Sequence, residues 1–351
     1  MGLINKFTRT NVEESLKKKR QENAAAVEVE NLVVQYVTST ETVEAVNGIS
    51  LKLEKKHTLG LVGETGAGKT TAMLALMNMV PYPPGVVKSG TVKVNGLDMR
   101  NLTPAELQTV RGSEIAMIFQ DPMTSLNPVL SVGEQIAESI ILHRHLTEKE
   151  AMVEAGKMLE MVGIDPNRVG EYPHQFSGGM RQRVGIAIAL ACNPTVLIAD
   201  EPTSALDVTI QAQILRMMKD LKEKNDTALI MITHDLGVVA ELCDEVAVMY
   251  AGRIVEYGKL EEVFNHTKHP YTEGLFNSLP NINSRQQKLQ PIPGLMPDPS
   301  NLPEGCAFAD RCAYATDACR KGNVPVHSFS ETHYAQCTAY ENPEFKIRRG
   351  N

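Results

Sequence analysis

The sequence predicts an α/β fold in which helices surround a parallel sheet, with a small antiparallel unit before it and a loop-rich unit after it. Residues 195–199 and 228–233 are continuous apolar runs, which is typical of parallel strands buried on both faces. Helical patterns between these runs indicate α/β crossover units. A glycine-rich segment, residues 63–68, breaks a compact apolar strand and opens a helix, as expected at a strand–loop–helix junction.

The first elements are expected to be strands. Residues 26–53 alternate apolar and polar side chains around the turn-like residues 38–41, which predicts short antiparallel strands. Residues 58–62 are the compact apolar strand that precedes the glycines. Residues 69–79 then carry apolar side chains at helical spacing.

The middle of the chain adds one strand and a helical subdomain. Residues 114–119 are a further apolar strand, and residues of about 123–191 are expected to be mainly helical. Residues 247–257 have the pattern of a hairpin that turns at Gly252. We therefore assign residues 27–264 to the main domain.

Both ends of the chain differ from this domain. Residues 1–26 are polar, with no apolar segment of a secretory signal, and we interpret them as a frayed or partly helical tail. After about residue 265 proline, asparagine and cysteine become more frequent and periodicity fades. We assign residues 265–351 to a small loop-rich extension.

Size and charge limit the possible functions. The 351 residues are 42% hydrophobic, which is enough for a main core and an appended unit. The net charge is −7, from 35 basic and 42 acidic residues, which disfavours a nucleic-acid partner. No apolar stretch reaches the roughly 18 to 20 residues that span a bilayer.

The glycine-rich segment predicts a phosphate-binding loop. Its glycines let backbone N–H groups turn toward phosphate oxygens, and the following helix adds its positive end. Lys69 can reach the β- and γ-phosphates, and the Thr70 hydroxyl can ligate Mg²⁺. The expected ATP-binding residues are Tyr36, Gly63, Glu64, Thr65, Gly66, Ala67, Gly68, Lys69, Thr70 and Thr71. Tyr36 has two interpretations, a ring that stacks on adenine or a half-buried strand tyrosine.

Polar side chains follow three of the predicted strands. Asp200 and Glu201 end one buried strand, where Asp200 would hold Mg²⁺ and Glu201 would polarise the attacking water. Gln120 follows residues 115–119 and can touch Mg²⁺ or that water. His234 follows residues 228–233 and can hydrogen-bond the γ-phosphate. Each residue alone has an ordinary surface interpretation, and their order along the chain favours function.

Four of the six cysteines lie in the last 46 residues. Because a cytosolic chain rarely keeps structural disulfides, a metal or cluster site is the favoured interpretation of this group. The gaps between them are five, six and seventeen residues, wider than the pairs of most structural zinc sites. The four are Cys306, Cys312, Cys319 and Cys337. Cys192 and Cys243 are expected to be buried small hydrophobes.

Taken in order, the motifs of residues 27–262 resemble the ATP-binding-cassette (ABC) ATPases. The deciding segment is Ser177-Gly178-Gly179, placed between the phosphate loop and Asp200-Glu201. The resemblance implies that this signature binds the ATP of a partner subunit, and that Ser204-Ala205-Leu206-Asp207 runs along the dimer interface. It also implies that Glu201 is the general base and His234 the γ-phosphate switch.

A narrower resemblance covers nearly the whole chain. Residues 120–128, residues 176–183 and the extension from His269 through Cys312 are similar to the ATPases of oligopeptide and dipeptide importers. This resemblance implies a second, non-identical ATPase subunit, two permease subunits, a solute-binding protein and a peripheral location on the cytoplasmic face of the membrane. It further implies a [4Fe–4S] cluster on the four cysteines, with zinc and then reduced thiols as alternatives.

Two departures and two alternatives accompany this interpretation. Met180 follows the signature glycines where most cassettes have glutamine, and residues 55–58 replace a common Gly-Glu turn. An importer for nickel, an opine or another small solute is one alternative. A soluble ABC ATPase that acts on nucleic acid is the other, although the basic insertions of such proteins are not seen.

Overall fold

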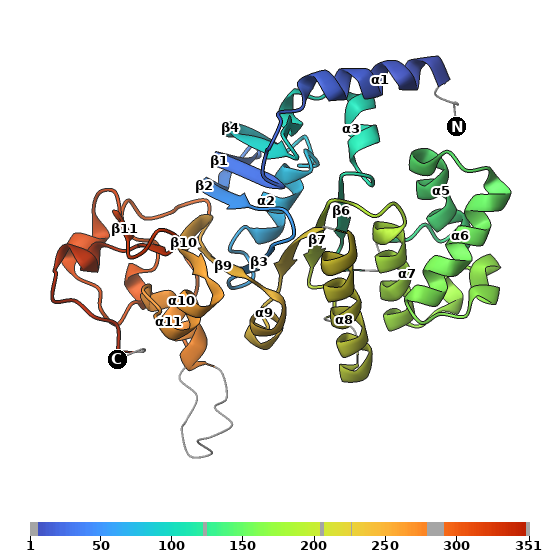
Figure 1. Ribbon diagram of the computed structural model, residues 1–351. Helices are drawn as coiled ribbons and strands as arrows, with labels where there is room; N and C mark the ends of the chain where they lie inside the picture. Colours follow the sequence, from blue (N-terminus) through green and yellow to red (C-terminus); the bar gives the residue numbers. More distant parts are fainter. Residues whose placement is uncertain (1–5, 122–124, 204–206, 226, 279–290, 349–351) are drawn as a thin grey trace.

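Two β-sheets organise the computed structural model, which describes residues 6–121, 125–203, 207–225, 227–278 and 291–348 (Figure 1). The smaller sheet is antiparallel and has the strand order β2-β1-β4-β5. Its predicted pair is confirmed, whereas β4 and β5 were not predicted. The strands are β1 (Val27–Val37), β2 (Thr42–Leu53), β4 (Gly85–Val94) and β5 (Leu97–Asp98).

The larger sheet has the order β11-β12-β10-β9-β3-β8-β7-β6. The strands β6, β7, β8, β3 and β9 run parallel, so their carboxyl ends lie at one edge. Every residue of β3, β7 and β8 is buried, as the continuous apolar runs predicted. The bounds are β3 (Thr58–Val62), β6 (Ile115–Ile118), β7 (Val196–Asp200), β8 (Ala228–Ile232), β9 (Glu245–Tyr250), β10 (Arg253–Lys259), β11 (Val326–Ser328) and β12 (Tyr334–Gln336).

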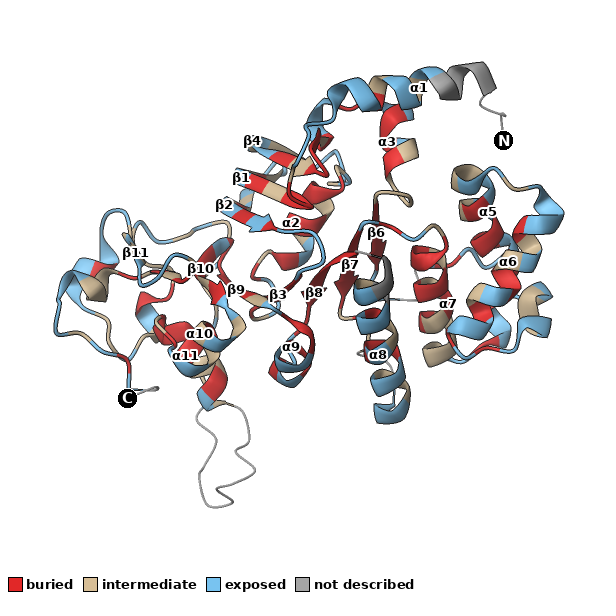
Figure 2. Ribbon diagram, viewed as in Figure 1, coloured by how far each residue is buried: buried red, intermediate tan, exposed pale blue. Residues whose placement is uncertain are grey.

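Helices pack around this sheet with their buried faces inward (Figure 2). A helical subdomain lies at the end of the molecule near β6, and Ser131 and Thr147 begin two of its helices with complete capping boxes. Its helices are α5 (Val132–Arg144), α6 (Glu148–Met161) and α7 (Gly178–Leu190), with short 3₁₀ turns at Pro166–Gly170 and Pro173–Gln175. The sheet helices are α2 (Lys69–Leu76), α8 (Val208–Asn225) and α9 (Leu236–Leu242).

The N-terminal segment is helical and anchored. Helix α1 (Lys6–Lys19) lies beside α3 (Pro104–Val110), next to the 3₁₀ turn Met99–Asn101 (Figure 1). The Glu106 carboxylate accepts from Lys19 Nζ and from Ser15 Oγ, both at 2.7 Å. Leu16 is buried against the same surface. The sequence predicted a frayed or partly helical tail, and residues 6–19 of this tail form a helix.

The C-terminal extension joins the main sheet. Helices α10 (Leu260–Asn265) and α11 (Pro270–Asn277) lead into it, and β12 (Tyr334–Gln336) pairs with β10 and with β11 (Val326–Ser328). The fully buried Glu256 carboxylate accepts from the backbone N–H groups of Lys268 and His269 and contacts the His333 ring. The loops between carry the 3₁₀ turns Ala309–Arg311, Asp317–Arg320 and Thr338–Glu341. The sequence indicated a loop-rich unit but not its place in the sheet.

No helix in the described ranges combines the length and the apolarity needed to cross a membrane.

The Glu106 contacts predict an acid-sensitive anchor for α1. Burial alone would raise the pKa of Glu106, but the bonds from Lys19, Thr103 and Ser15 outweigh it and lower the pKa to about 2. This stabilisation is present above the unfolded pKa of 4.5 and is lost as the pH falls toward 2. We expect Glu106→Gln to lower the free energy of unfolding at pH 7 by about 1–3 kcal/mol.

Urea unfolding at pH 7 and at several acidic pH values checks this prediction. The difference between the wild-type chain and Glu106→Gln should shrink below pH 4.5. A difference that did not change with pH would contradict the role of the carboxylate.

Candidate functional site

The predicted phosphate loop connects β3 to α2 and lies between two other strands. Gly63 has φ +153° and Gly68 has φ +97°, backbone conformations that L side chains rarely adopt. A Cβ on Gly63 would lie 2.2 Å from the Met249 carbonyl oxygen, and one on Gly68 would lie 2.2 Å from that of Ala45. Both positions therefore require glycine for conformation and for space.

Lys69 and Thr70 open α2 directly after the loop. The Lys69 Nζ donates to the carbonyl oxygens of Gly63 at 2.7 Å and Glu64 at 2.9 Å, so the ammonium lies within the loop. Burial lowers the pKa of Lys69, although the carboxylates of Asp200, Glu201 and Glu64 oppose this shift. A buried ammonium held by loop carbonyls is placed to meet phosphate oxygens.

Thr70 and Asp200 form a pair of oxygen donors. The Thr70 Oγ1 donates to Asp200 Oδ2 at 2.7 Å, joining the start of α2 to the end of β7. Burial raises the pKa of Asp200, and the hydrogen bond from Thr70 offsets this only in part. Hard oxygen donors at a strand end suit Mg²⁺, so these residues fit the cation that the sequence predicted.

The structure brings Gln120, Glu201 and His234 together. Gln120 Nε2 donates to Glu201 Oε2 at 3.1 Å, and His234 Nδ1 lies 3.1 Å from Glu201 Oε1. The three residues follow β6, β7 and β8, which are neighbours in the sheet. Glu201 has φ +45°, a strained conformation for a residue with a side chain, and its N–H donates to the Ile232 carbonyl. The carboxylate is thus fixed between an amide and an imidazole.

Tyr36 lies on β1 near the start of α2. Its hydroxyl is 3.3 Å from Thr71 Oγ1, and its ring is half-buried. The contact places the ring beside the phosphate loop's helix. Stacking on adenine remains a prediction.

The signature residues lie apart from the phosphate loop. Ser177 is the N-cap of α7, and its Oγ accepts from the Met180 N–H at 3.4 Å. Figure 1 shows α7 well separated from α2, and among the described residues no hydrogen bond joins the signature, Gly178 and Gly179 included, to the loop.

Asp207 lies at the start of α8. Its carboxylate accepts from the backbone N–H groups of Thr209 and Ile210 at 3.1 and 3.0 Å. Residues 204–206 of the predicted interface segment, and residues 122–124 of the motif after Gln120, lie outside the described residues.

The four C-terminal cysteines line one small cavity together with His269 and Phe308. All are free thiols, and burial raises the pKa of Cys312 to about 11 and that of Cys337 to about 12. Among the described residues, no group of three or more His, Cys, Asp or Glu side chains has the spacing of a metal site. Elsewhere in the chain Cys243 is buried and Cys192 is half-buried.

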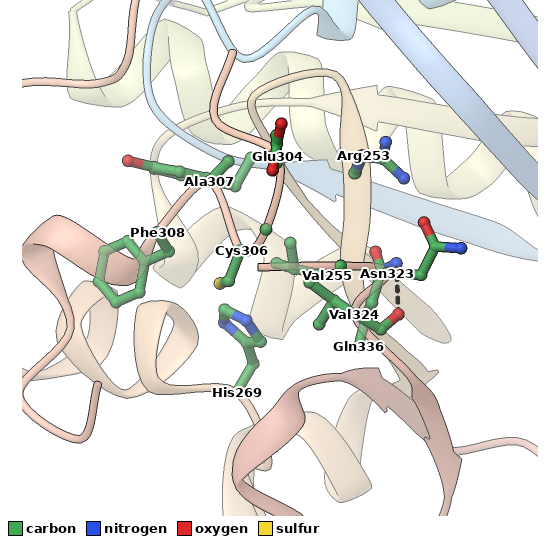
Figure 3. A pocket seen from close by; sticks show the side chains of 13 residues that line it. Arg253, Val255, His269, Glu304, Cys306, Ala307, Phe308, Asn323, Val324 and Gln336 are labelled. Atoms are coloured by element: carbon green, nitrogen blue, oxygen red, sulfur yellow. Dashed lines mark hydrogen bonds between the residues drawn. The ribbon is translucent and has the colours of Figure 1, made fainter. Parts of the chain in front are cut away.

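A second pocket, of 230 Å³, adjoins this cavity (Figure 3). Cys306, His269 and Phe308 line both, and Arg253 and Glu304 line the second pocket only.

Sequence reasoning missed the partners of Glu64. Arg311 donates through Nη1 and Nη2 to the two Glu64 carboxylate oxygens at 2.9 and 3.1 Å, and the Glu64 N–H donates to Tyr271 Oη at 2.8 Å. Arg311 precedes Cys312 in the C-terminal extension, so the sequence drew attention to its neighbour and not to Arg311 itself. Nothing local in the sequence indicates that its partner lies 247 positions away.

Comparison with known proteins agrees with this geometry. Residues 46–204 match the ABC transporter family, and residues 255–319 match the C-terminal region of oligopeptide/dipeptide transporters. The oligopeptide transport ATP-binding protein OppD of Bacillus subtilis is 50% identical over 313 residues, which cover 88% of this chain and 87% of that protein. The chain belongs to the peptide-transport branch of the ABC ATPases.

Further relatives support this ABC ATPase assignment. The dipeptide transport ATP-binding protein DppD of Bacillus subtilis is 46% identical, over 88% of this chain and 93% of its own. Among solved structures, a dimeric post-hydrolysis state of the ATP-binding cassette MJ0796 with ADP and Pi has a TM-score of 0.62 at 26% identity. It covers 67% of this chain and 98% of its own.

The contacts of Gly68 generate a prediction about the loop. We expect Gly68→Ala to weaken Mg-ATP binding at least about tenfold, because the new Cβ would clash with the Ala45 carbonyl and force the loop open. Equilibrium titration with Mg-ATP measures the effect. Gly170→Ala is a matched control, since a Cβ there meets nothing within 4 Å. Equal affinity of the two variants would show that the loop tolerates a side chain at position 68.

Proposed function

We propose that this ABC ATPase is the energy-coupling subunit of an importer for dipeptides and oligopeptides. The observation that carries the proposal is the convergence of Gln120, Glu201 and His234 beside a complete phosphate loop, in a chain whose extension matches peptide transporters. The similar proteins are named as oligopeptide and dipeptide transport ATP-binding proteins.

The proposed mechanism divides phosphate binding, proton transfer and Mg²⁺ binding among these residues. Lys69 and the loop N–H groups hold the β- and γ-phosphates, and Glu201 accepts a proton from the attacking water. His234 hydrogen-bonds the γ-phosphate while Gln120 orients Glu201 and the water. Thr70, Asp200 and Gln120 would hold Mg²⁺, which neutralises charge on the phosphates.

The separation of the signature from the loop supports a dimer mechanism. Ser177, Gly178 and Gly179 lie on a different unit from Lys69, so they are available to the ATP of a partner subunit. ATP would then close two cassettes, with Asp207 near their interface, and hydrolysis would reopen them. MJ0796 is a dimeric cassette in its solved structures. We propose that the second cassette is a non-identical paralogue.

The remaining partners are membrane proteins. We propose that two permease subunits dock on the segment from Gln120 to about residue 190 and that a solute-binding protein delivers the peptide. The chain would lie peripherally on the cytoplasmic face of the membrane. An importer for nickel or another small solute remains the second candidate, and peptide uptake by the reconstituted complex separates the two.

Glu201→Gln tests the proposed base. The variant should bind Mg-ATP but hydrolyse it at least about 100-fold more slowly, because the amide cannot accept the proton. It should also accumulate as a closed dimer in the presence of ATP, which gel filtration detects. Turnover at the wild-type rate would make the assignment of Glu201 wrong.

We further propose that the four C-terminal cysteines hold a [4Fe–4S] cluster. Their shared cavity supports this, because cysteine thiolates are the ligands of such clusters. Zinc binds four thiolates at about 2.3 Å and so needs them close together. The gaps of five, six and seventeen residues between the cysteines are wider than the pairs of most structural zinc sites, which favours the cluster over zinc. Its role would be to staple a loop-rich unit.

Anaerobic purification tests the cluster. We expect about four iron and four sulfide ions per chain and a broad visible absorbance band, all lost in Cys312→Ser. Cys192→Ser is the matched control, since Cys192 lies outside the cavity and should leave the iron content unchanged. Anaerobic protein without iron would contradict the proposal.

A further inference from the structure

One residue of the phosphate loop is held by the C-terminal extension. The two carboxylate oxygens of Glu64 accept from the two terminal nitrogens of Arg311, and its backbone N–H donates to the Tyr271 hydroxyl. Its carbonyl oxygen accepts from Lys69 Nζ at 2.9 Å. Glu64 therefore joins the ammonium that meets the phosphates to a unit more than 200 positions further along the chain.

Arg311 is itself fixed in place. Only 7% of its side chain is exposed, against 30% for Glu64. Its Nε donates to the Pro293 carbonyl at 2.8 Å, and Nη1 lies 3.3 Å from the Tyr250 hydroxyl. A guanidinium with this many fixed bonds presents its fork to a carboxylate with little further loss of freedom.

The same contacts reach the cysteine cavity. Arg311 precedes Cys312, and Phe308 lines the cavity. The Phe308 ring packs on Tyr271 and on Tyr250, with centroids 5.4 and 5.2 Å apart. A continuous set of packed side chains therefore runs from the cysteines to the phosphate loop.

We propose that Arg311 is a positioning residue for the phosphate loop. Its fork fixes the Glu64 carboxylate, and through Glu64 it fixes the carbonyl that holds Lys69 in line with the phosphates. It also neutralises a carboxylate that would otherwise face the triphosphate. The affinity for Mg-ATP therefore depends on the cysteine-rich extension. This inference rests on the ATPase activity stated above.

Equilibrium titration of the full chain with Mg-ATP tests this role. Arg311→Met removes both hydrogen bonds that hold the partly exposed Glu64 carboxylate, so it should weaken Mg-ATP binding about tenfold, with a smaller change in turnover at saturating ATP. Arg311→Lys keeps the charge but loses the fork, and it should recover part of the affinity. Arg320→Met is the matched control. Arg320 also adjoins a cysteine, but its partner Asp310 is 80% exposed. The Arg320→Met variant should therefore bind Mg-ATP with the affinity of the parent chain.

A double-mutant cycle separates positioning from a general structural role. If Arg311 acts through Glu64, Arg311→Met should cost little further affinity in a Glu64→Gln chain. An undiminished loss in that background would show that Arg311 only supports the fold of the extension, which would overturn the inference.

Two other results have clear meanings. Unchanged affinity in Arg311→Met, with normal binding by the parent chain, would overturn the inference alone. Failure of the parent chain to bind Mg-ATP would overturn the ATPase function, and the inference with it. If Arg311→Met does not fold, Glu64→Gln with Arg311→Lys completes the same cycle.

Discussion

The site depends on the close backbone packing of the phosphate loop between the two sheets. The Ala45 carbonyl of β2 touches the loop from the antiparallel sheet, and the Met249 carbonyl of β9 touches it from the larger one. Asn47 ties the same strands together, because its amide donates to the Ala251 carbonyl in the turn after β9. The relative position of the two sheets therefore sets the shape of the loop. A shift of either sheet would change the positions of the loop N–H groups that are expected to bind phosphate.

The side chains that we propose for catalysis depend on a second constraint, which is strand order. Gln120, Glu201 and His234 are far apart in the sequence, but β6, β7 and β8 are adjacent and parallel, so the residues after them meet. Glu201 has a strained backbone conformation, and its carboxylate lies between the side chains of Gln120 and His234. The buried strands β6, β7 and β8 hold the backbone around Glu201 in place, and their packing offsets the cost of this strain.

Local pattern explains which parts could be predicted. The bounds of β3 and β8 matched their apolar runs to within a residue, because strands buried on both faces consist mainly of apolar residues. Strand β4 was missed, since the run Lys88-Ser89-Gly90 interrupts its alternation. The Arg311–Glu64 pair and the docking of α1 on α3 are contacts between distant segments, and no local periodicity encodes them. The clustering of the cysteines was foreseen, whereas the link of their unit to the loop was not.

The pairing of β12 with β10 has a consequence for synthesis of the chain. Strand β10 has seven residues, and on the side away from β9 two of them, Glu256 and Tyr257, pair with β12. Since a ribosome makes the N-terminus first, this edge stays open until the residues around Tyr334 have emerged. During that interval the nascent chain carries an unpaired strand edge, the kind of surface on which chains pair with one another and aggregate. Pairing with β12 then covers the middle of this edge and shortens the part of β10 that is exposed.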